Sequence, residues 1–475
     1  MRPKQNFSKI HLFSKIHLKV FFYLSVILVF FPIQSLSADS DLITIEQIGG
    51  TNEAIVRDIN VTTTNTTAFN TDVLQNGNNN VAFIEQLGED IFTKVQQLGD
   101  DNEVRINVAD GVTPPSTVSP FPFDGDLNRR DIFQQGNRNA VALTQIGDLN
   151  EATISQFGND NKAVVDQASS PTIAFNNVAT ITQSGNENYA SVTQGTEFGL
   201  GCDNCTATIT QTGDNNGEPT LPDGTILTSI FQTGTNNVAT ITQSGNANNA
   251  TIAQGTEFGQ DCENCTATIT QTGDGNGAVD PITGETTTTI FQAGINNRAT
   301  ITQTGNGNAA AISQGAVSGC SNCVATITQV GDGNGVVNAN NIPTIDTPLT
   351  VPAGLDVVGL RVADGTRIVQ EGGNLEANLT QTGNGNLALI EQSNLTAGAL
   401  STAGIIQTGD NNNAVITQDG FNNSANITQT GDANYGFIAQ VGDGLNAEIT
   451  QNGSNNQAVI IQGGSSAPSV FIVQP

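Results

Sequence analysis

Residues 407–418 have the sequence QTGDNNNAVITQ, and residues 418–429 continue as QDGFNNSANITQ. Both follow the pattern Q-x-G-x-x-N-x-A-x-I-x-Q, in which the last glutamine of one copy is the first of the next. Five such copies run from Gln407 to Gln462, and another clean copy begins at Gln183. A unit of eleven residues cannot bury its own apolar face, so it must stack on its neighbours. The pattern therefore predicts a repeat protein rather than a set of globular domains.

Alternation within each copy predicts one short strand followed by one turn. In Ala179-Thr-Ile-Thr-Gln183, alanine, isoleucine and glutamine share one face, and the two threonines share the other. The following segment, Ser184-Gly-Asn-Glu-Asn188, is rich in residues that accept tight turns and positive φ angles. Two units would make a flattened coil of about 22 residues, and stacked coils would repeat every ~4.8 Å. The predicted fold is all-β: a solenoid of two-strand coils with surface-loop inserts.

Inward glutamine and asparagine would form amide ladders along the axis, each donating to one neighbour and accepting from the next. Isoleucine, valine and alanine would fill the space between the ladders. A disordered Asn/Gln-rich tract is the other interpretation, and the β-branched alternation disfavours it. The predicted ladder and core positions are Gln183, Gly185, Asn188, Ala190, Gln194, Gln243, Gly245, Asn248, Ala250, Gln254, Gln429, Asn434, Gln440, Gln451, Asn456 and Gln462.

About 20 recognisable units predict roughly ten coils and a body on the order of 50 Å long. A second period of 60 residues is superposed, since the stretch that begins at Val178 recurs at Val238 and Arg298. Proline cannot join a central ladder, so five proline-containing or irregular interruptions are predicted to be surface loops. They span residues 59–72, 108–131, 217–229, 277–289 and 335–367, with Pro114, Pro115, Pro120, Pro122, Pro219, Pro222, Pro281, Pro343, Pro348 and Pro352.

The chain is accordingly divided into six segments. They are a signal segment (1–38), N-terminal repeats with inserts (39–167), three 60-residue blocks (168–334), an insert (335–367), C-terminal repeats (368–462) and a tail (463–475).

The N-terminus has the features of a secretory signal. Five basic residues lie within residues 2–19, and the apolar run Val20–Ile33 is shorter than the ~20 residues of an ordinary membrane span. Small residues place the predicted cleavage after Ser37 or Ala38; an uncleaved N-terminal anchor is the alternative. No later segment is long and apolar enough to cross a bilayer, so no membrane span is expected after cleavage.

Composition excludes several function classes. Without residues 1–38, ten Lys and Arg remain against 44 Asp and Glu, a formal net charge of −34. Nucleic-acid binding, which needs clustered basic residues, is therefore not expected. Both histidines, His11 and His17, leave with the signal, and with them the usual general base and the commonest metal ligand. No catalytic constellation or cofactor motif is recognisable, and we expect no enzyme and no cofactor.

Three Cys-x-x-Cys pairs stand in predicted turns. Counted back from the next glutamine, the first cysteine replaces the motif glycine and the second replaces the motif asparagine. In an exported protein, a local disulfide that closes each turn is the leading interpretation. A zinc site built from two pairs, and free or intermolecular thiols, are the alternatives. The pairs are Cys202 with Cys205, Cys262 with Cys265, and Cys320 with Cys323.

Two further patterns can each be interpreted either as ordinary local structure or as a binding site. Gly273–Gly277 and Gly331–Gly335 resemble fragments of calcium loops, but both lack the bidentate glutamate of an EF-hand and suit ordinary turns. Outward Thr-x-Thr pairs recur between residues 178 and 328. Threonine is favoured on exposed strand faces, yet a flat threonine array also suits ice binding.

The spacing of Gln243, Gly245, Asn248, Ala250 and Gln254 resembles the curlin repeat of curli, the secreted amyloid fibres of bacterial biofilms. The resemblance covers most of residues 43–462. It implies a β-solenoid subunit, export through an outer-membrane secretion channel, and templated extracellular polymerisation with other curlin-like subunits for adhesion and matrix building.

The chain departs from a typical curlin subunit in its length, its inserts, its cysteines and its short segment before the first repeat. A major subunit, a nucleator and an accessory component therefore all remain possible roles. The alternative function is that of a monomeric cell-surface solenoid, an adhesin or a ligand-binding protein. Because the last regular unit ends at Gln462 and the first strand begins near Ile43, both ends are expected to be open to pairing.

Overall fold

The computed structural model describes residues 42–59, 70–87, 91–106, 127–167, 175–195, 201–217, 226–255, 261–277, 288–317, 319–336, 365–394, 399–465 and 468–475. Within these ranges all regular structure is β-strand. The predicted signal segment lies outside the described residues. So does most of each predicted insert, including all ten of their prolines.

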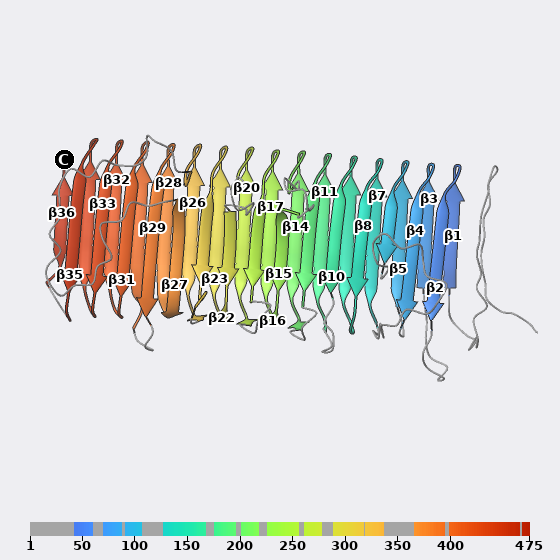
Figure 1. The fold of residues 1–475 in the computed structure, drawn as a ribbon, viewed down its shortest axis with the longest axis horizontal. Helices are drawn as coiled ribbons and strands as arrows, with labels where there is room; N and C mark the ends of the chain where they lie inside the picture. The colour runs from blue at the N-terminus through green and yellow to red at the C-terminus, as the bar shows by residue number, and fades with distance from the viewer. Residues whose placement is uncertain are drawn as a thin grey trace, which may run out of the picture.

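The first of two long sheets, sheet A, has 16 parallel strands. They lie side by side along the length of the body, from β1 at one end to β36 at the other (Figure 1). Each strand pairs with the sheet A strand one coil further along the chain. The strands are β1 (Leu42–Ile48), β3 (Asn70–Asn76), β5 (Phe92–Leu98), β7 (Arg129–Gln135), β9 (Glu151–Phe157), β11 (Val178–Ser184), β14 (Thr206–Thr212), β17 (Val238–Ser244), β20 (Thr266–Thr272), β23 (Arg298–Thr304), β26 (Val324–Val330), β28 (Leu375–Thr382), β30 (Ser401–Thr408), β32 (Ser424–Thr430), β34 (Asn446–Asn452) and β36 (Val470–Gln474).

Sheet B faces sheet A across the interior, and in its central layers each strand is split into two short pieces. Its strands are β2 (Glu53–Ile59), β4 (Val81–Leu87), β6 (Glu103–Ile106), β8 (Ala140–Gln145), β10 (Lys162–Gln167), β12 (Tyr189–Gln194), β13 (Cys202–Asp203), β15 (Thr228–Gln232), β16 (Gly234–Thr235), β18 (Ala250–Gln254), β19 (Cys262–Glu263), β21 (Thr288–Gln292), β22 (Gly294–Ile295), β24 (Ala310–Gln314), β25 (Cys320–Ser321), β27 (Thr366–Gly373), β29 (Leu387–Asn394), β31 (Asn413–Asp419), β33 (Tyr435–Val441) and β35 (Gln457–Gly463).

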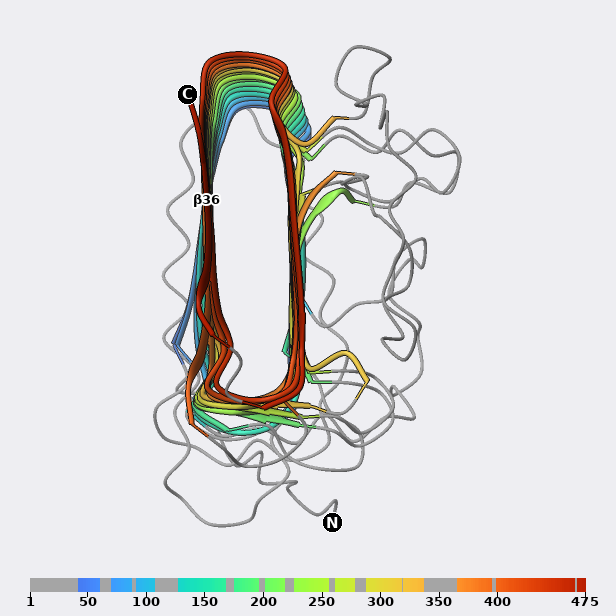
Figure 2. The ribbon, with the colours of Figure 1, turned by 90° about the vertical axis from the view of Figure 1, so that its left-hand side faces the viewer.

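The chain alternates between the two sheets, and each full coil places like residues on like residues. Gln183 pairs with Gln211 and Ile181 with Ile209. Where no insert intervenes, the repeat along one sheet is 22 residues, as from Gln407 to Gln429. Seen along the axis, the coils superpose on one flattened outline with two long sides (Figure 2). The predicted β-solenoid of two-strand coils is confirmed.

The solenoid has more layers than the ten coils predicted. Degraded repeats pair as well as clean ones: β3, β5 and β7 join sheet A although Thr71, Thr93 and Arg130 stand at the position of the motif alanine. All three side chains are buried, so the position accepts polar groups that have partners inside. Sixteen layers at ~4.8 Å give a body about 70 Å long.

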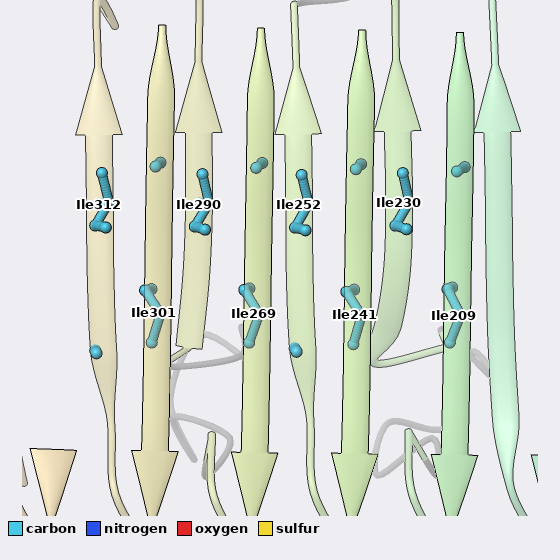
Figure 3. Packing of buried hydrophobic residues seen from close by; sticks show 14 of the residues in the cluster. Ile209, Ile230, Ile241, Ile252, Ile269, Ile290, Ile301 and Ile312 are labelled. Carbon is cyan, nitrogen blue, oxygen red and sulfur yellow. The ribbon is translucent and has the colours of Figure 1, made fainter. Parts of the chain in front are cut away.

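The core is a set of columns rather than a central cluster. Ile209, Ile241 and Ile269 stack along sheet A, and Ile230 and Ile252 stack along sheet B opposite them (Figure 3). Each is at most 1% exposed. Because each layer buries its isoleucines only against adjacent layers, every coil depends on its two neighbours for its hydrophobic stabilisation.

The sheets are continuous across the predicted segment boundaries. Strand β9 pairs with β11, and β26 pairs with β28, so the insert at 335–367 does not interrupt sheet A. Part of the predicted tail belongs to the body: residues 470–474 form β36, which pairs with β34. The regular structure therefore extends one strand beyond Gln462, where the sequence places the last unit.

Candidate functional site

Two columns of hydrogen-bonded glutamines run through the interior. In sheet A, Nε2 of each glutamine donates to Oε1 of the next, without a break from Gln47 to Gln474, at 2.6–3.0 Å. In sheet B a second column runs from Gln145 to Gln462 at 2.8–3.0 Å. The structure places all the predicted glutamines in these columns: Gln183, Gln243, Gln429 and Gln451 in sheet A, and Gln194, Gln254, Gln440 and Gln462 in sheet B.

In most of these glutamines Nε2 also donates to a backbone carbonyl oxygen. Gln429 Nε2 donates to the carbonyl oxygen of Asn413 at 3.1 Å, and Gln183 Nε2 donates to that of Lys162 at 3.0 Å. Both glutamines are fully buried. When every donor of a buried amide has an acceptor, the hydrogen bonds inside the protein replace those lost to water. Polar residues can therefore occupy the interior of every coil.

A third column follows the turns that connect sheet A to sheet B, here named the Gly–Asn edge. Its asparagines run without a break from Asn52 to Asn456. Asn434 shows the pattern: its Nδ2 donates to Gly453 O at 2.8 Å, and its Oδ1 accepts from the Asn456 backbone N–H at 2.9 Å. The predicted Asn188 and Asn248 belong to the same column.

The turn requires glycine at its start for two reasons, its positive φ angle and its close approach to the next layer. Gly185 has a φ of +121°, and a Cβ there would lie 2.0 Å from Gly213 O in the next layer. Gly245 is placed in the same way beneath Gly273. The close approach lets each layer follow the last at strand spacing, which fixes the register of the whole edge. The predicted Ala190 and Ala250 are fully buried in the core.

Six segments of the chain match the curlin associated repeat: residues 128–158, 136–168, 227–255, 285–315, 398–431 and 420–453. These six matches, spread along the chain, support a curlin-repeat family for it. No curated protein matches its sequence. The Gln, Gly and Asn positions that identify a curlin repeat are thus the positions that carry the columns described above.

The six cysteines lie on the opposite edge, named here the Cys-containing edge, in turns that lead from sheet B to sheet A. The structure joins Cys202 to Cys205, Cys262 to Cys265, and Cys320 to Cys323 as local disulfides. Among the described residues no group of His, Cys, Asp and Glu could hold a metal ion.

Cys205 takes the place of a curlin-repeat asparagine, as its spacing predicts. Its backbone N–H donates to Asn177 Oδ1 at 2.9 Å, and the carbonyl oxygen of Cys202 accepts from Asn177 Nδ2 at 2.5 Å. Disulfide layers alternate with asparagine layers along this edge, since Asn237 lies between Cys205 and Cys265. A covalent link therefore closes the turn where the side-chain amide is missing.

A surface column on the Gly–Asn edge was not predicted. The residue after each curlin-repeat glycine is mostly Asn or Asp, and its Oδ1 accepts a backbone N–H from the preceding layer. Asn186 N donates to Asp214 at 2.7 Å, Asp214 N to Asn246 at 2.8 Å, and Asn246 N to Asp274 at 2.7 Å. The recurrence of Asn and Asp at this one position was the available signal.

The calcium-like segments Gly273–Gly277 and Gly331–Gly335 belong to this column. Asp274 and Asp332 accept backbone N–H groups, and Gly275 and Gly333 supply a φ of +64°. Every polar group named here has a role in the turn itself, so turn formation accounts for both segments.

Threonine covers the outer face of sheet A in its central six strands, β11 to β26. In-register pairing aligns two columns, and Arg298 is the one charged outward residue on these six strands. The columns are Thr180, Thr208, Thr240, Thr268, Thr300 and Thr326, and Thr182, Thr210, Thr242, Thr270, Thr302 and Thr328.

A second apolar cluster, also not predicted, lies on the outer face of sheet B near the C-terminal end. Leu389, Val415, Tyr435 and Phe437 project from β29, β31 and β33 and are at most 2% exposed. Burial raises the pKa of the Tyr435 phenol above its ordinary range, so the group stays neutral. Apolar residues at both the inward and the outward positions of these strands were the signal in the sequence for burial on both faces.

Proposed function

We propose that the chain is a secreted structural subunit that stacks end to end, on further copies or on other curlin-repeat subunits, into extracellular fibres for adhesion and biofilm matrix. The family and the solenoid indicate a structural or adhesive protein rather than an enzyme. The single observation that carries the finer proposal is that three hydrogen-bond columns traverse nearly the whole body, each with one direction throughout.

This direction makes the two ends complementary. In the sheet A column the donors point toward the C-terminal end, so the first glutamine, Gln47, offers an acceptor to a layer below it. On the Gly–Asn edge the last asparagine, Asn456, offers Oδ1 to a backbone N–H of a layer above it. Head-to-tail stacking joins donors to acceptors, whereas head-to-head stacking opposes like groups. Complementary ends of this kind favour an open-ended fibre in which every subunit points in the same direction.

Export is part of the same proposal. Residues 1–38 have the features of a signal segment, and the curlin-repeat matches imply the bacterial cell surface. Passage through an outer-membrane secretion channel would follow, and the subunit would act in the fibre as a major subunit, a nucleator or an accessory component. Among the described residues no helix is long and apolar enough to span a bilayer.

The test is seeded growth of the purified chain 39–475. We expect fibres by electron microscopy, a lag phase that preformed seeds abolish, and a fibre-diffraction spacing of ~4.8 Å along the axis. A chain that stays monomeric for days at high concentration, and that seeds do not change, would contradict the fibre proposal. That result would favour a monomeric surface adhesin with the same solenoid.

The threonine face supports a second candidate function, ice binding. Its residues repeat at ~4.8 Å across strands and roughly 6.6 Å along them, which gives a flat lattice of hydroxyl and methyl groups. Thermal hysteresis of the monomeric chain tests it, with Thr242→Lys as the variant expected to abolish the effect and Thr193→Lys, on sheet B, as the matched control. Absence of hysteresis in the unaltered chain would exclude this candidate.

A further inference from the structure

The C-terminal end of the solenoid is uneven. Strand β36 extends sheet A one layer beyond β34, while in sheet B β35 is the last described strand and pairs with β33. On the Gly–Asn edge no further turn among the described residues lies above the turn from Gly453 to Asn456. Ser454 and Asn455 are exposed, and Asn456 is the one asparagine of its column that is not buried.

Strand β36 fits its position less tightly than the other strands of sheet A. Only five residue pairs join it to β34, against seven between β32 and β34. On its outer face Phe471 and Val473 are 59% and 74% exposed, where threonine and other polar residues cover most neighbouring strands. Inside, Ile472 and Gln474 continue the core and the glutamine column.

The closing contact at the turn is also loose. Asn456 Nδ2 lies 3.5 Å from Pro475 O, whereas Asn434 Nδ2 lies 2.8 Å from Gly453 O one layer below. A Cβ on Gly453 would lie 3.1 Å from Pro475 O, against 2.0 Å for Gly431 and the oxygen above it. The strand therefore completes sheet A but does not complete the Gly–Asn edge.

At five inward and turn positions the first coil carries the same residue as the layer beneath β36. In the register of the solenoid, Ile45 would lie on Ile449, Gln47 on Gln451, and Gly49 on Gly453. Beyond the turn, Asn52 would lie on Asn456 and Ala54 on Ala458. A second copy placed here, with β1 on β34 and β2 on β35, continues the sheet A glutamine column and the asparagine column of the Gly–Asn edge. The sheet B glutamine column, which begins at Gln145, would not be continued at the junction.

A second copy that stacks on β36 instead meets an incomplete layer. Its β1 would continue sheet A, but its Gly49, Asn52 and β2 would lie one strand spacing, ~4.8 Å, too far from Gly453, Asn456 and β35. The described residues contain no strand of sheet B above β35 and no turn above Asn456 to fill that space, so backbone groups on both sides of it would lack partners.

From this we infer that β36 is a displaceable cap: it occupies the place in sheet A that β1 of a second copy takes when the solenoid grows. The inference rests on the proposed end-to-end assembly and adds its regulation. Growth requires β36 to leave its place on β34, so the fraction of time that β36 is undocked sets the growth rate at this end.

Cysteine cross-linking distinguishes the two junctions. Glu46→Cys in one copy should form a disulfide with Thr450→Cys in another, because the inferred register places these two residues on adjacent strands at ~4.8 Å, within disulfide range. A disulfide with Val473→Cys instead of Thr450→Cys would show stacking on β36, and would overturn the cap while leaving the fibre proposal intact.

Locking the cap tests its effect on growth. Thr450 and Val473 pair directly, so cysteines at both positions in one chain would tie β36 to β34. We expect the oxidised chain to elongate at least about tenfold more slowly than the unaltered chain, and reductant to restore the rate. A matched lock at Thr428 and Thr450, which also pair directly, should leave growth unchanged.

The outcomes separate the two proposals. Growth of the oxidised Thr450/Val473 chain at the unaltered rate overturns the cap alone. Failure of the unaltered chain, the reduced chain and a chain lacking 464–475 to grow on seeds overturns the fibre proposal, and the cap with it.

Discussion

The two edges of the solenoid follow the same chain through the same number of layers, yet they differ in regularity. On the Gly–Asn edge each described turn keeps one length, and asparagine fills the column from Asn52 to Asn456. On the Cys-containing edge the equivalent position changes from asparagine to cysteine and, near the C-terminal end, to Leu375 and Leu445.

The difference shows which contacts set the register. On the Gly–Asn edge each asparagine bonds the layers on both sides, and each glycine approaches the next layer too closely for any side chain. A change there disturbs three layers. On the Cys-containing edge the same position holds an asparagine, a disulfide or a buried leucine, so its composition can vary while the sheets stay aligned.

The largest effect should come from closing the space at the Gly–Asn edge. Gly185→Ala places a Cβ 2.0 Å from Gly213 O at a φ of +121°, and we expect a loss of more than about 3 kcal/mol of unfolding free energy. Gly275→Ala is the control: its φ is +64° and nothing lies within 4 Å of the added Cβ, so about 1 kcal/mol is expected. Thermal unfolding of the two variants measures the difference, and equal losses would show that this edge does not set the register.

A smaller loss is expected when a column residue is removed without a clash. Asn434→Ala leaves Gly453 O and the Asn456 N–H without their partner, and Gln429→Ala breaks the sheet A column. Each should cost about 1–3 kcal/mol, and Thr428→Ala on the outer face well under that. Denaturant unfolding compares the three variants. If Thr428→Ala costs as much as the other two, the assignment of inner and outer faces is wrong.

Much of this could be predicted from sequence because period and parity are local properties. The alternation in Ala179–Gln183 predicts which face is inward, and the spacing of Gln183, Gly185 and Asn188 predicts the turn. Counting from Gln211 also predicts that Cys202 and Cys205 stand at the glycine and asparagine positions, where the structure places them.

What the sequence did not reveal depends on contacts between layers. Thr71 and Arg130 do not match the motif, and only pairing with neighbouring strands shows that their strands complete the sheet. The hydrogen bond from Asn186 N to Asp214 joins residues 28 positions apart, so the motif alone shows a turn and not its partner. Burial of Tyr435 on an outer face likewise depends on what covers it.

The Cys-containing edge should respond less than the Gly–Asn edge to loss of its link. Peptide mapping without reductant should show Cys202–Cys205, Cys262–Cys265 and Cys320–Cys323 as the linkages. Replacing one pair by serine should cost about 2 kcal/mol, the chain-entropy value for so short a loop. Pairing between distant cysteines, or stoichiometric zinc in the purified protein, would contradict this account of the edge.

The smallest expected effect concerns the charge on the Gly–Asn edge. The surface column of the Gly–Asn edge carries Asp214, Asp274 and Asp332, and asparagine at 246 and 306 separates them, so these carboxylates are two layers or about 10 Å apart. Stacking a second copy brings two strongly acidic bodies together, which slows association. Acid should lessen this repulsion as the pH approaches the sequence pI of about 4.1. It leaves the glutamine and asparagine columns intact, because amides do not titrate in this range.

Fibre growth should therefore be a few-fold faster at about pH 4–5 than at about pH 8. It should also be faster at ~0.15 M salt, where the screening length is about 8 Å, than at ~0.01 M, where it is about 30 Å. Growth rates measured at each pH and salt concentration with the same seeds test this prediction. Asp274→Asn, which keeps the Oδ1 acceptor, should give part of the acid effect at neutral pH.

Slower growth in acid together with growth that does not depend on salt would mean that charge repulsion does not limit assembly. The acidic column would then have a positive role in assembly, such as holding calcium between stacked copies, and added calcium should accelerate growth of the unaltered chain more than that of Asp274→Asn.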